Sequence, residues 1–187
     1  MGTTHVRRLR AAPVIALACL LLLAGCGGDD PAPIVADPTP SPSATPTPTA
    51  SAAPQPWEER SKAGAVAFVE HWVEVFNEAG ASGQTEELQL VSARDCVTCN
   101  GAIQLINDWS AQGSTLTSAG WKVVAAQIPT SQRRPPFDVA VRIRRSPQVL
   151  RAADGSVQRF PGSTETYNAR VSWSAGRWSL ANLNQVT

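Results

Sequence analysis

The sequence predicts one α+β domain in which N-terminal helices pack on a curved antiparallel sheet. Apolar residues recur with the spacing of a helix up to about residue 111, and they alternate with polar residues from residue 121 onward. All six tryptophans lie in the last 131 residues, from 57 to 187, a length that can bury one core. Helices followed by alternating strands are typical of the α+β class.

Three helices are expected in the first half of this domain. Residues 58 to 79 carry an apolar stripe at i, i+3, i+4 and i+7, and the glycines at 80 and 83 end it. A shorter helix is expected over residues 84 to 91, with acidic residues in its first turn. Asp95 can cap a third helix from residue 96 to about 111, whose core-facing residues are Ile103, Ile106 and Trp109.

The second half of the domain predicts strands joined by tight turns. Residues 121 to 128 form an apolar run, and Asp154-Gly155 and Ala175-Gly176 are turn signals. Two longer runs alternate strictly, which predicts half-buried strands. Their core-facing residues are Phe137, Val139, Val141 and Ile143 in the first run and Tyr167, Ala169, Val171 and Trp173 in the second.

The first 25 residues have the form of a cleaved export signal. Arginines at positions 7, 8 and 10 precede 13 mostly apolar residues from 11 to 23, too few to span a bilayer as a helix. The run Leu23-Ala24-Gly25-Cys26 resembles the lipobox of bacterial lipoproteins, which implies a diacylglyceryl thioether on Cys26. The alternatives are an ordinary secretory signal cut near Ala24 and an uncleaved N-terminal anchor.

Residues 27 to 56 are predicted to be an unfolded tether. They contain nine prolines interleaved with Thr, Ser and Ala, and therefore have neither apolar periodicity nor the donors for a sheet. In an extended polyproline conformation such a segment reaches on the order of 90 Å. The predicted organisation is a signal over 1–25, a lipidated Cys26 with its tether over 26–56, and a domain over 57–187.

Charge is divided between the two halves of the domain. Residues 57–121 carry a net charge of −6 and residues 133–170 a net charge of +5, whereas the whole chain is at +1, which argues against nucleic acid as a partner. Arg142, Arg144 and Arg170 lie on the polar faces of the two alternating strands. They form a candidate contact surface for anionic headgroups, an anionic wall polymer or an acidic envelope protein. The alternative is an ordinary solvated sheet face.

Cys96 and Cys99 are the cysteines that remain outside the signal and the lipidation site. In an oxidising compartment, a Cys-x-x-Cys pair at this spacing predicts a structural disulfide. A redox couple at a helix N-terminus and a metal site are the alternatives. A structural zinc site needs about four ligands, however, and His71 is the sole histidine after the signal.

Three further residues are candidates for acid–base or pocket chemistry. His71 lies on the first helix among Glu70, Glu74 and Glu78, where a solvated histidine is the expected reading and a metal or acid–base role the alternative. Tyr167 and Asp108 are polar groups that could line a pocket inside the domain. Because Tyr167 shares a face with Val171 and Trp173, we expect it to pack in the core.

The order of these elements resembles the cone of the nuclear-transport-factor-2-like superfamily. The segments K-A-G-A-V-A-F-V-E-H-W at 62–72 and D-C-V-T-C at 95–99, with the lipobox and tether, also resemble an actinobacterial lipoprotein family of unknown function. That resemblance implies an envelope location and this fold, and implies no activity.

We therefore expect a lipoprotein held at the extracytoplasmic face of the cell membrane that displays a non-catalytic binding domain, without cofactor or metal. The alternative is a small-molecule-binding or enzymatic domain that uses a pocket inside the cone.

Overall fold

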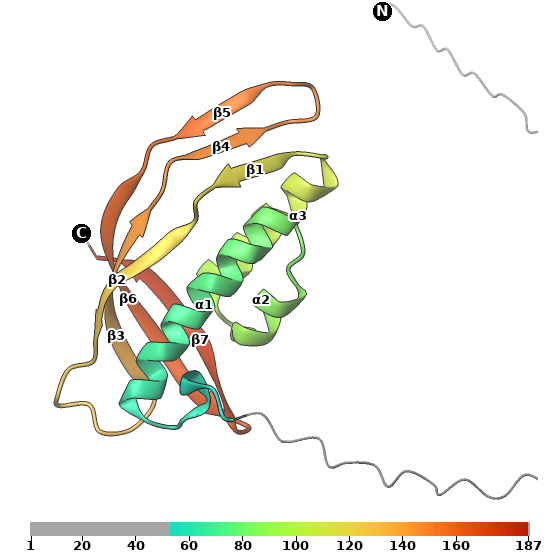
Figure 1. Cartoon of the computed structure of the whole chain (residues 1–187). Coiled ribbons are helices and arrows are strands. Elements are labelled where there is room, and N and C mark those ends of the chain that lie inside the picture. The colour runs from blue at the N-terminus through green and yellow to red at the C-terminus, as the bar shows by residue number, and fades with distance from the viewer. Residues whose placement is uncertain (1–52, 187) are drawn as a thin grey trace, which may run out of the picture. The chain divides into compact units, whose positions relative to one another are not determined.

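The structure, a computed structural model, describes residues 53–186. The signal, Cys26 and the tether up to residue 52 lie outside the described residues. The described residues belong to one compact unit. Its elements, shown in Figure 1, are η1 (Pro56–Glu58), α1 (Lys62–Ser82), α2 (Glu86–Val91), α3 (Val97–Ala111), β1 (Thr115–Ser118), β2 (Trp121–Gln127), β3 (Phe137–Arg145), β4 (Gln148–Arg151), β5 (Val157–Phe160), β6 (Ser163–Ser174) and β7 (Arg177–Gln185).

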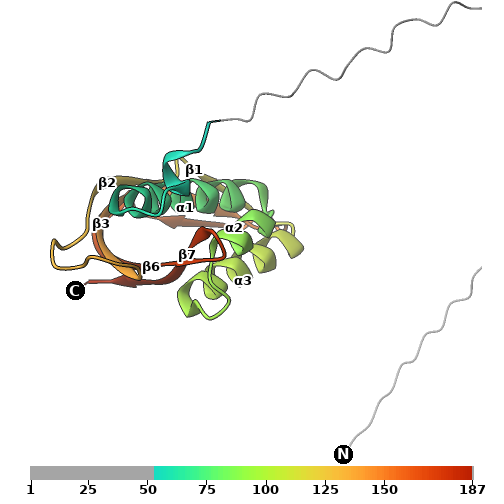
Figure 2. The same ribbon diagram turned by 90° about the horizontal axis from the view of Figure 1, so that it is seen from below.

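The strands form two antiparallel sheets, which confirms the predicted α+β class. The larger sheet has the order β2-β3-β6-β7, and the smaller has the order β1-β4-β5. In Figure 2 the four-stranded sheet curves around α1. In Figure 1 the three shorter strands extend beyond that sheet as an arm. No helix within residues 53–186 is both long and apolar enough to cross a membrane.

The core fills the space between α1 and the four-stranded sheet. Val139, Val141 and Ile143 are fully buried on β3, while the intervening Arg142 and Arg144 are exposed. Each fully buried aliphatic side chain of this size contributes about 1.5–3 kcal/mol. The predicted alternation is thus confirmed on β3 and, up to Val171, on β6. Trp173 departs from it: it is only half-buried and meets Trp178 edge-on, with ring centroids 5.0 Å apart.

Helices α1 and α3 begin at other residues than predicted, because the N-cap residue determines where each helix starts. α1 starts at Lys62 and not at residue 58, since the Ser61 hydroxyl accepts a hydrogen bond from the Gly64 N–H at 2.9 Å. α3 starts at Val97, and its N-cap is Cys96, whose sulfur accepts from the Cys99 N–H. The prediction of Asp95 as this cap was wrong, and Asp95 is exposed.

The arm was not predicted from the sequence. β1, β4 and β5 each have four residues, too few to show a reliable alternation. The turn at Asp154-Gly155 was predicted, and it joins β4 to β5 as expected, with Gly155 at φ 85°. Trp109 was expected in the core, but it is only half-buried.

A close backbone contact holds the chain that leads into α1. A Cβ atom on Gly64 would lie 2.0 Å from the carbonyl oxygen of Glu59. The same carbonyl accepts a hydrogen bond from the Trp178 indole N–H at 2.8 Å. The segment before α1 is therefore fixed between the helix and β7, and the position next to it requires glycine.

Replacing this glycine should destabilise the domain. Gly64→Ala forces the Glu59 backbone away from both α1 and Trp178, and we expect it to lower the free energy of unfolding by about 1–3 kcal/mol in urea titrations. Gly101→Ala is the matched control on α3, because a Cβ there meets nothing within 4 Å. That control should raise the free energy of unfolding by about 0.5–1 kcal/mol through helix propensity. Equal effects of the two variants would contradict the close contact.

Candidate functional site

The solvent-facing side of the four-stranded sheet gathers cations on neighbouring strands. Arg144 on β3 pairs with Lys122 on β2 and with Thr164 on β6. Arg142 lies two residues along the same strand, opposite Thr166. Residues that pair directly across strands share a face of the sheet. We call the surface made by Lys122, Arg142, Arg144, Thr164 and Thr166, all of them exposed, the outward face.

The cations of the outward face are not neutralised by the protein. Within the described residues, none of Lys122, Arg142 and Arg144 takes part in an ion pair. Arg170 is exposed as predicted, but its guanidinium lies 3.6 Å from the Asp138 carboxylate, so it does not belong with the free cations. Lys122 was missed from the sequence, because its place beside Arg144 depends on the pairing of β2 with β3.

The inner face of the same sheet is filled by side chains. Val139, Val141, Ile143, Ala169 and Val171 are each 0% exposed, and they pack against the buried face of α1. The alternative hypothesis from the sequence, a small-molecule-binding or enzymatic domain, requires a pocket at this inner face. Apolar packing occupies it.

A polar cluster closes one end of the inner face. Arg145 is the last residue of β3 and forms an ion pair with Glu165. Its Nε also donates to the Ser163 hydroxyl at 2.9 Å. The Tyr167 hydroxyl donates to the second Glu165 oxygen at 2.7 Å. The Arg145 guanidinium stacks over the Trp121 ring, 5.5 Å from its centroid.

This cluster shifts the pKa values of its two acids in opposite directions. The hydrogen bond from Tyr167, followed by that from Ser163 and by the charge of Arg145, lowers the pKa of Glu165. Burial first, and then the hydrogen bond to Glu165, raises the pKa of Tyr167 to about 12. At neutral pH the cluster is therefore a carboxylate held by a guanidinium and a neutral phenol.

The remaining acid–base candidates are not brought together. His71 stacks on Trp57 with ring centroids 4.2 Å apart, whereas Glu70, Glu74 and Glu78 are exposed. Asp108 is an exposed residue of α3. It does not meet Tyr167, whose hydroxyl donates a hydrogen bond to Glu165. Residues 53–186 contain no group of three His, Cys, Asp or Glu side chains placed to hold a metal ion.

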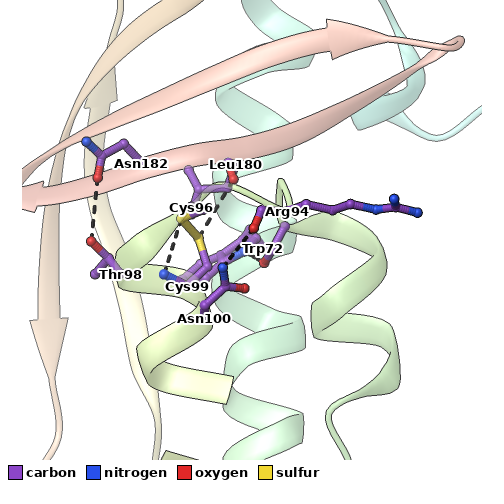
Figure 3. The surroundings of a disulfide bond; sticks show 9 residues. Trp72, Arg94, Cys96, Thr98, Cys99, Asn100, Leu180 and Asn182 are labelled. Atoms are coloured by element: carbon purple, nitrogen blue, oxygen red, sulfur yellow. Dashed lines mark hydrogen bonds between the residues drawn. A yellow bond between two sulfur atoms is a disulfide. The ribbon is translucent and has the colours of Figure 1, made fainter. Parts of the chain in front are cut away.

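Cys96 and Cys99 lie with their sulfur atoms at disulfide distance, 2.01 Å apart (Figure 3). Both are almost fully buried, at 0% and 1% exposure. The loop before them is fixed to β7 by a hydrogen bond from the Ala93 N–H to the Leu180 carbonyl at 2.9 Å. Exchange with another thiol requires access to the sulfur atoms, so this burial favours a structural role over a redox one.

The phenol in the polar cluster can be titrated selectively, because Tyr167 is the single tyrosine of the chain. We expect a tyrosinate absorbance midpoint of about 12 in the folded protein and about 10 in denaturant. A raised phenol pKa stabilises the folded state below pH 10, and this contribution is lost as the pH rises toward 12. Glu165→Gln should lower the folded midpoint by removing the carboxylate. A folded midpoint near 10, with near-ultraviolet circular dichroism still native, would contradict the cluster.

Several solved structures are similar to part of this chain. The intermembrane space region of the chloroplast protein ARC6 is 14% identical, with 69% of this chain and 98% of that chain covered at a TM-score of 0.49. An uncharacterised protein with a cystatin-like fold from Caulobacter vibrioides is 9% identical, with 65% and 89% covered and a TM-score of 0.39. An NTF2-like protein with a cystatin-like fold from Novosphingobium aromaticivorans is 12% identical, with 64% and 79% covered and a TM-score of 0.38.

No curated protein matches the sequence significantly. A family model matches residues 36–184, which is more than half of the chain. The chain therefore belongs to DUF6318, a family of unknown function.

Proposed function

We propose that this protein is a cell-envelope lipoprotein, anchored by a lipid on Cys26 outside the cytoplasmic membrane, whose domain is a non-catalytic docking module. The outward face is its contact surface, and its partner is the anionic phospholipid surface of the membrane. The single observation that carries this proposal is the group of three unneutralised cations on adjacent strands.

The arrangement of these cations costs stability, which supports a role in binding. Lys122 and Arg144 are directly opposite each other in the β2–β3 ladder. Like charges in that position are destabilising. An anionic phosphate placed over the pair relieves the repulsion and accepts hydrogen bonds from both cations. The hydroxyls of Thr164 and Thr166 on the neighbouring strand add further donors to the same surface.

The proposed anchor makes even weak contacts with the membrane effective. An extended tether of about 30 residues reaches on the order of 90 Å, so it keeps the domain within that distance of the bilayer and raises its effective concentration there. Each basic residue near an anionic membrane contributes about 1 kcal/mol. The three cations together thus contribute about 3 kcal/mol, roughly a hundredfold in affinity.

The acid–base groups of the domain are committed to structure, which supports a non-catalytic role. Tyr167 donates its proton to Glu165, and Arg145 neutralises that carboxylate. The His71 ring is covered on one side by Trp57. Tyr167 and Glu165 are therefore not poised to exchange a proton with a substrate, because each already has its partner.

The anchor is tested in cells by Cys26→Ala. Without the thiol there is no site for the thioether, so we expect the domain to leave the membrane fraction or to accumulate as an uncleaved precursor. Fractionation and mass spectrometry of the mature N-terminus measure both outcomes. A variant that is processed normally and stays with the membrane would overturn the lipid anchor.

The outward face is tested in vitro with residues 27–187 and vesicles that contain phosphatidylglycerol. Arg142→Glu combined with Arg144→Glu should weaken vesicle binding by roughly 30-fold or more at low salt, because two favourable contacts become repulsive. The difference should shrink as salt is raised. Thermal stability should stay the same or rise slightly, since both side chains are exposed and Arg144→Glu replaces the repulsion with Lys122 by an attraction.

Arg133→Glu combined with Arg134→Glu is the matched control. It changes the net charge by the same amount at two exposed residues between β2 and β3, away from the outward face. This control should retain most of the binding. Equal loss in both double variants, equal binding to vesicles of phosphatidylcholine alone, or capture of an anionic wall polymer without vesicle binding would overturn the proposed partner.

A further inference from the structure

A cavity of about 400 Å³ lies among α1, α3 and β1, and we call it the helix-end cavity. It is lined on α1 by Phe76 and Gly80, on α3 by residues from Ala102 to Trp109, and by Leu116 of β1 and Trp121 of β2. A second cavity of about 170 Å³ adjoins it and shares the walls around Gly80, Ile106 and Trp109. Together they form a trough between the two longest helices, beside the end of the inner face at which Trp121 lies.

The walls of the helix-end cavity are mostly hydrocarbon, and most of their polar groups are already bonded. The Asn77 amide donates to the Trp121 carbonyl at 2.9 Å and accepts from the Trp121 N–H at 2.7 Å. The Ser118 hydroxyl accepts from the Gly120 N–H at 2.9 Å. Among the described residues that line the cavity, Glu78 is the one charged side chain, and it is exposed. A charged ligand would find no cation in these walls.

One polar atom at this wall has no partner. The indole nitrogen of Trp121 is buried, and it is the one buried side-chain polar atom in residues 53–186 without a hydrogen bond. An unpaired buried donor lowers stability. The ring itself is fixed by Phe76, with centroids 4.7 Å apart, and by the Arg145 guanidinium. This nitrogen is closed off from the cavity, so Trp121 contributes a rigid aromatic wall and no polar contact.

We propose that the helix-end cavity binds an uncharged, mostly hydrocarbon molecule, such as a lipid-like alcohol or ester. The volume lies within the range of about 300–1,000 Å³ that is usual for small-molecule sites. The apolar walls favour hydrocarbon, and an unpaired carboxylate in them would be costly to desolvate. Leu105, at the cavity wall, is 47% exposed, so an occupant would also cover apolar surface that now meets water.

This site is independent of the proposed membrane contact. Its walls contain neither Lys122 nor the arginines of the outward face. The charge-reversal variants should therefore leave ligand binding intact, and variants of the cavity should leave vesicle binding intact. A failure of one proposal is thereby distinguishable from a failure of the other.

The test uses residues 27–187 and the fluorescent probe N-phenyl-1-naphthylamine. We expect saturable binding of the probe to the native protein. We expect 1-decanol to displace it at a concentration at least tenfold lower than decanoate, since burying the unpaired carboxylate is unfavourable.

Ala102→Phe fills the cavity from α3 and should weaken probe binding at least tenfold, because the phenyl ring takes the place of the ligand. Gln104→Phe is the matched control, since it adds the same ring at an exposed position of the same helix that does not line the cavity.

A second blocking variant covers the case in which Ala102→Phe fails to fold. Gly80→Leu places a side chain in the cavity from α1. A Cβ atom has room there, because its nearest contact would be the Leu116 side chain at 3.6 Å. Absence of saturable binding in the native protein, unchanged binding in a folded blocking variant, equal displacement by decanoate, or equal loss in Gln104→Phe would overturn the proposal.

Discussion

The pairing of β3 with β6 is the constraint on which the rest of the domain depends. Phe137 pairs with Val171 at one end of this ladder, and Arg145 pairs with Ser163 at the other. Because side chains alternate along a strand, this register puts the valines of both strands against α1 and leaves Arg142 and Arg144 in water. A slip of one residue would bury both arginines without partners, at a cost of several kcal/mol for each charge. The core and the outward face are therefore two results of one alignment.

The same register explains how a carboxylate is tolerated on the inner face. Glu165 pairs with Ile143, which is fully buried, so its side chain points toward the core side of the sheet. Arg145 lies two residues further along β3 and reaches the carboxylate from the same face. Tyr167 reaches it from the other side with its hydroxyl. The polar cluster thus closes the core where the sheet ends, and it satisfies every charge that it brings there.

The sequence predicts those parts of the domain that depend on periodicity, and it misses those that depend on strand pairing. The alternation from Phe137 to Ile143 predicts the buried face of β3 correctly, because a period of two needs no knowledge of neighbours. The ion pair of Arg170 with Asp138 and the place of Lys122 beside Arg144 follow only once the strands are aligned. The helix-end cavity was missed for a related reason. β1, which forms part of its wall, has four residues and no clear pattern.

Two local arrangements lower the stability of this fold, and they occur at consecutive residues. The Trp121 indole N–H is buried without an acceptor, and Lys122 lies directly opposite another cation. Consecutive side chains of a strand point to opposite faces, so the first contributes to the helix-end cavity and the second to the outward face. Locally unfavourable arrangements of this kind are expected at binding sites, because a ligand can supply the missing interaction. The Trp121 ring forms a rigid aromatic wall of the cavity, and a phosphate on the outward face would relieve the repulsion at Lys122. The start of β2 is thus the point at which both proposed contacts meet the same short stretch of chain.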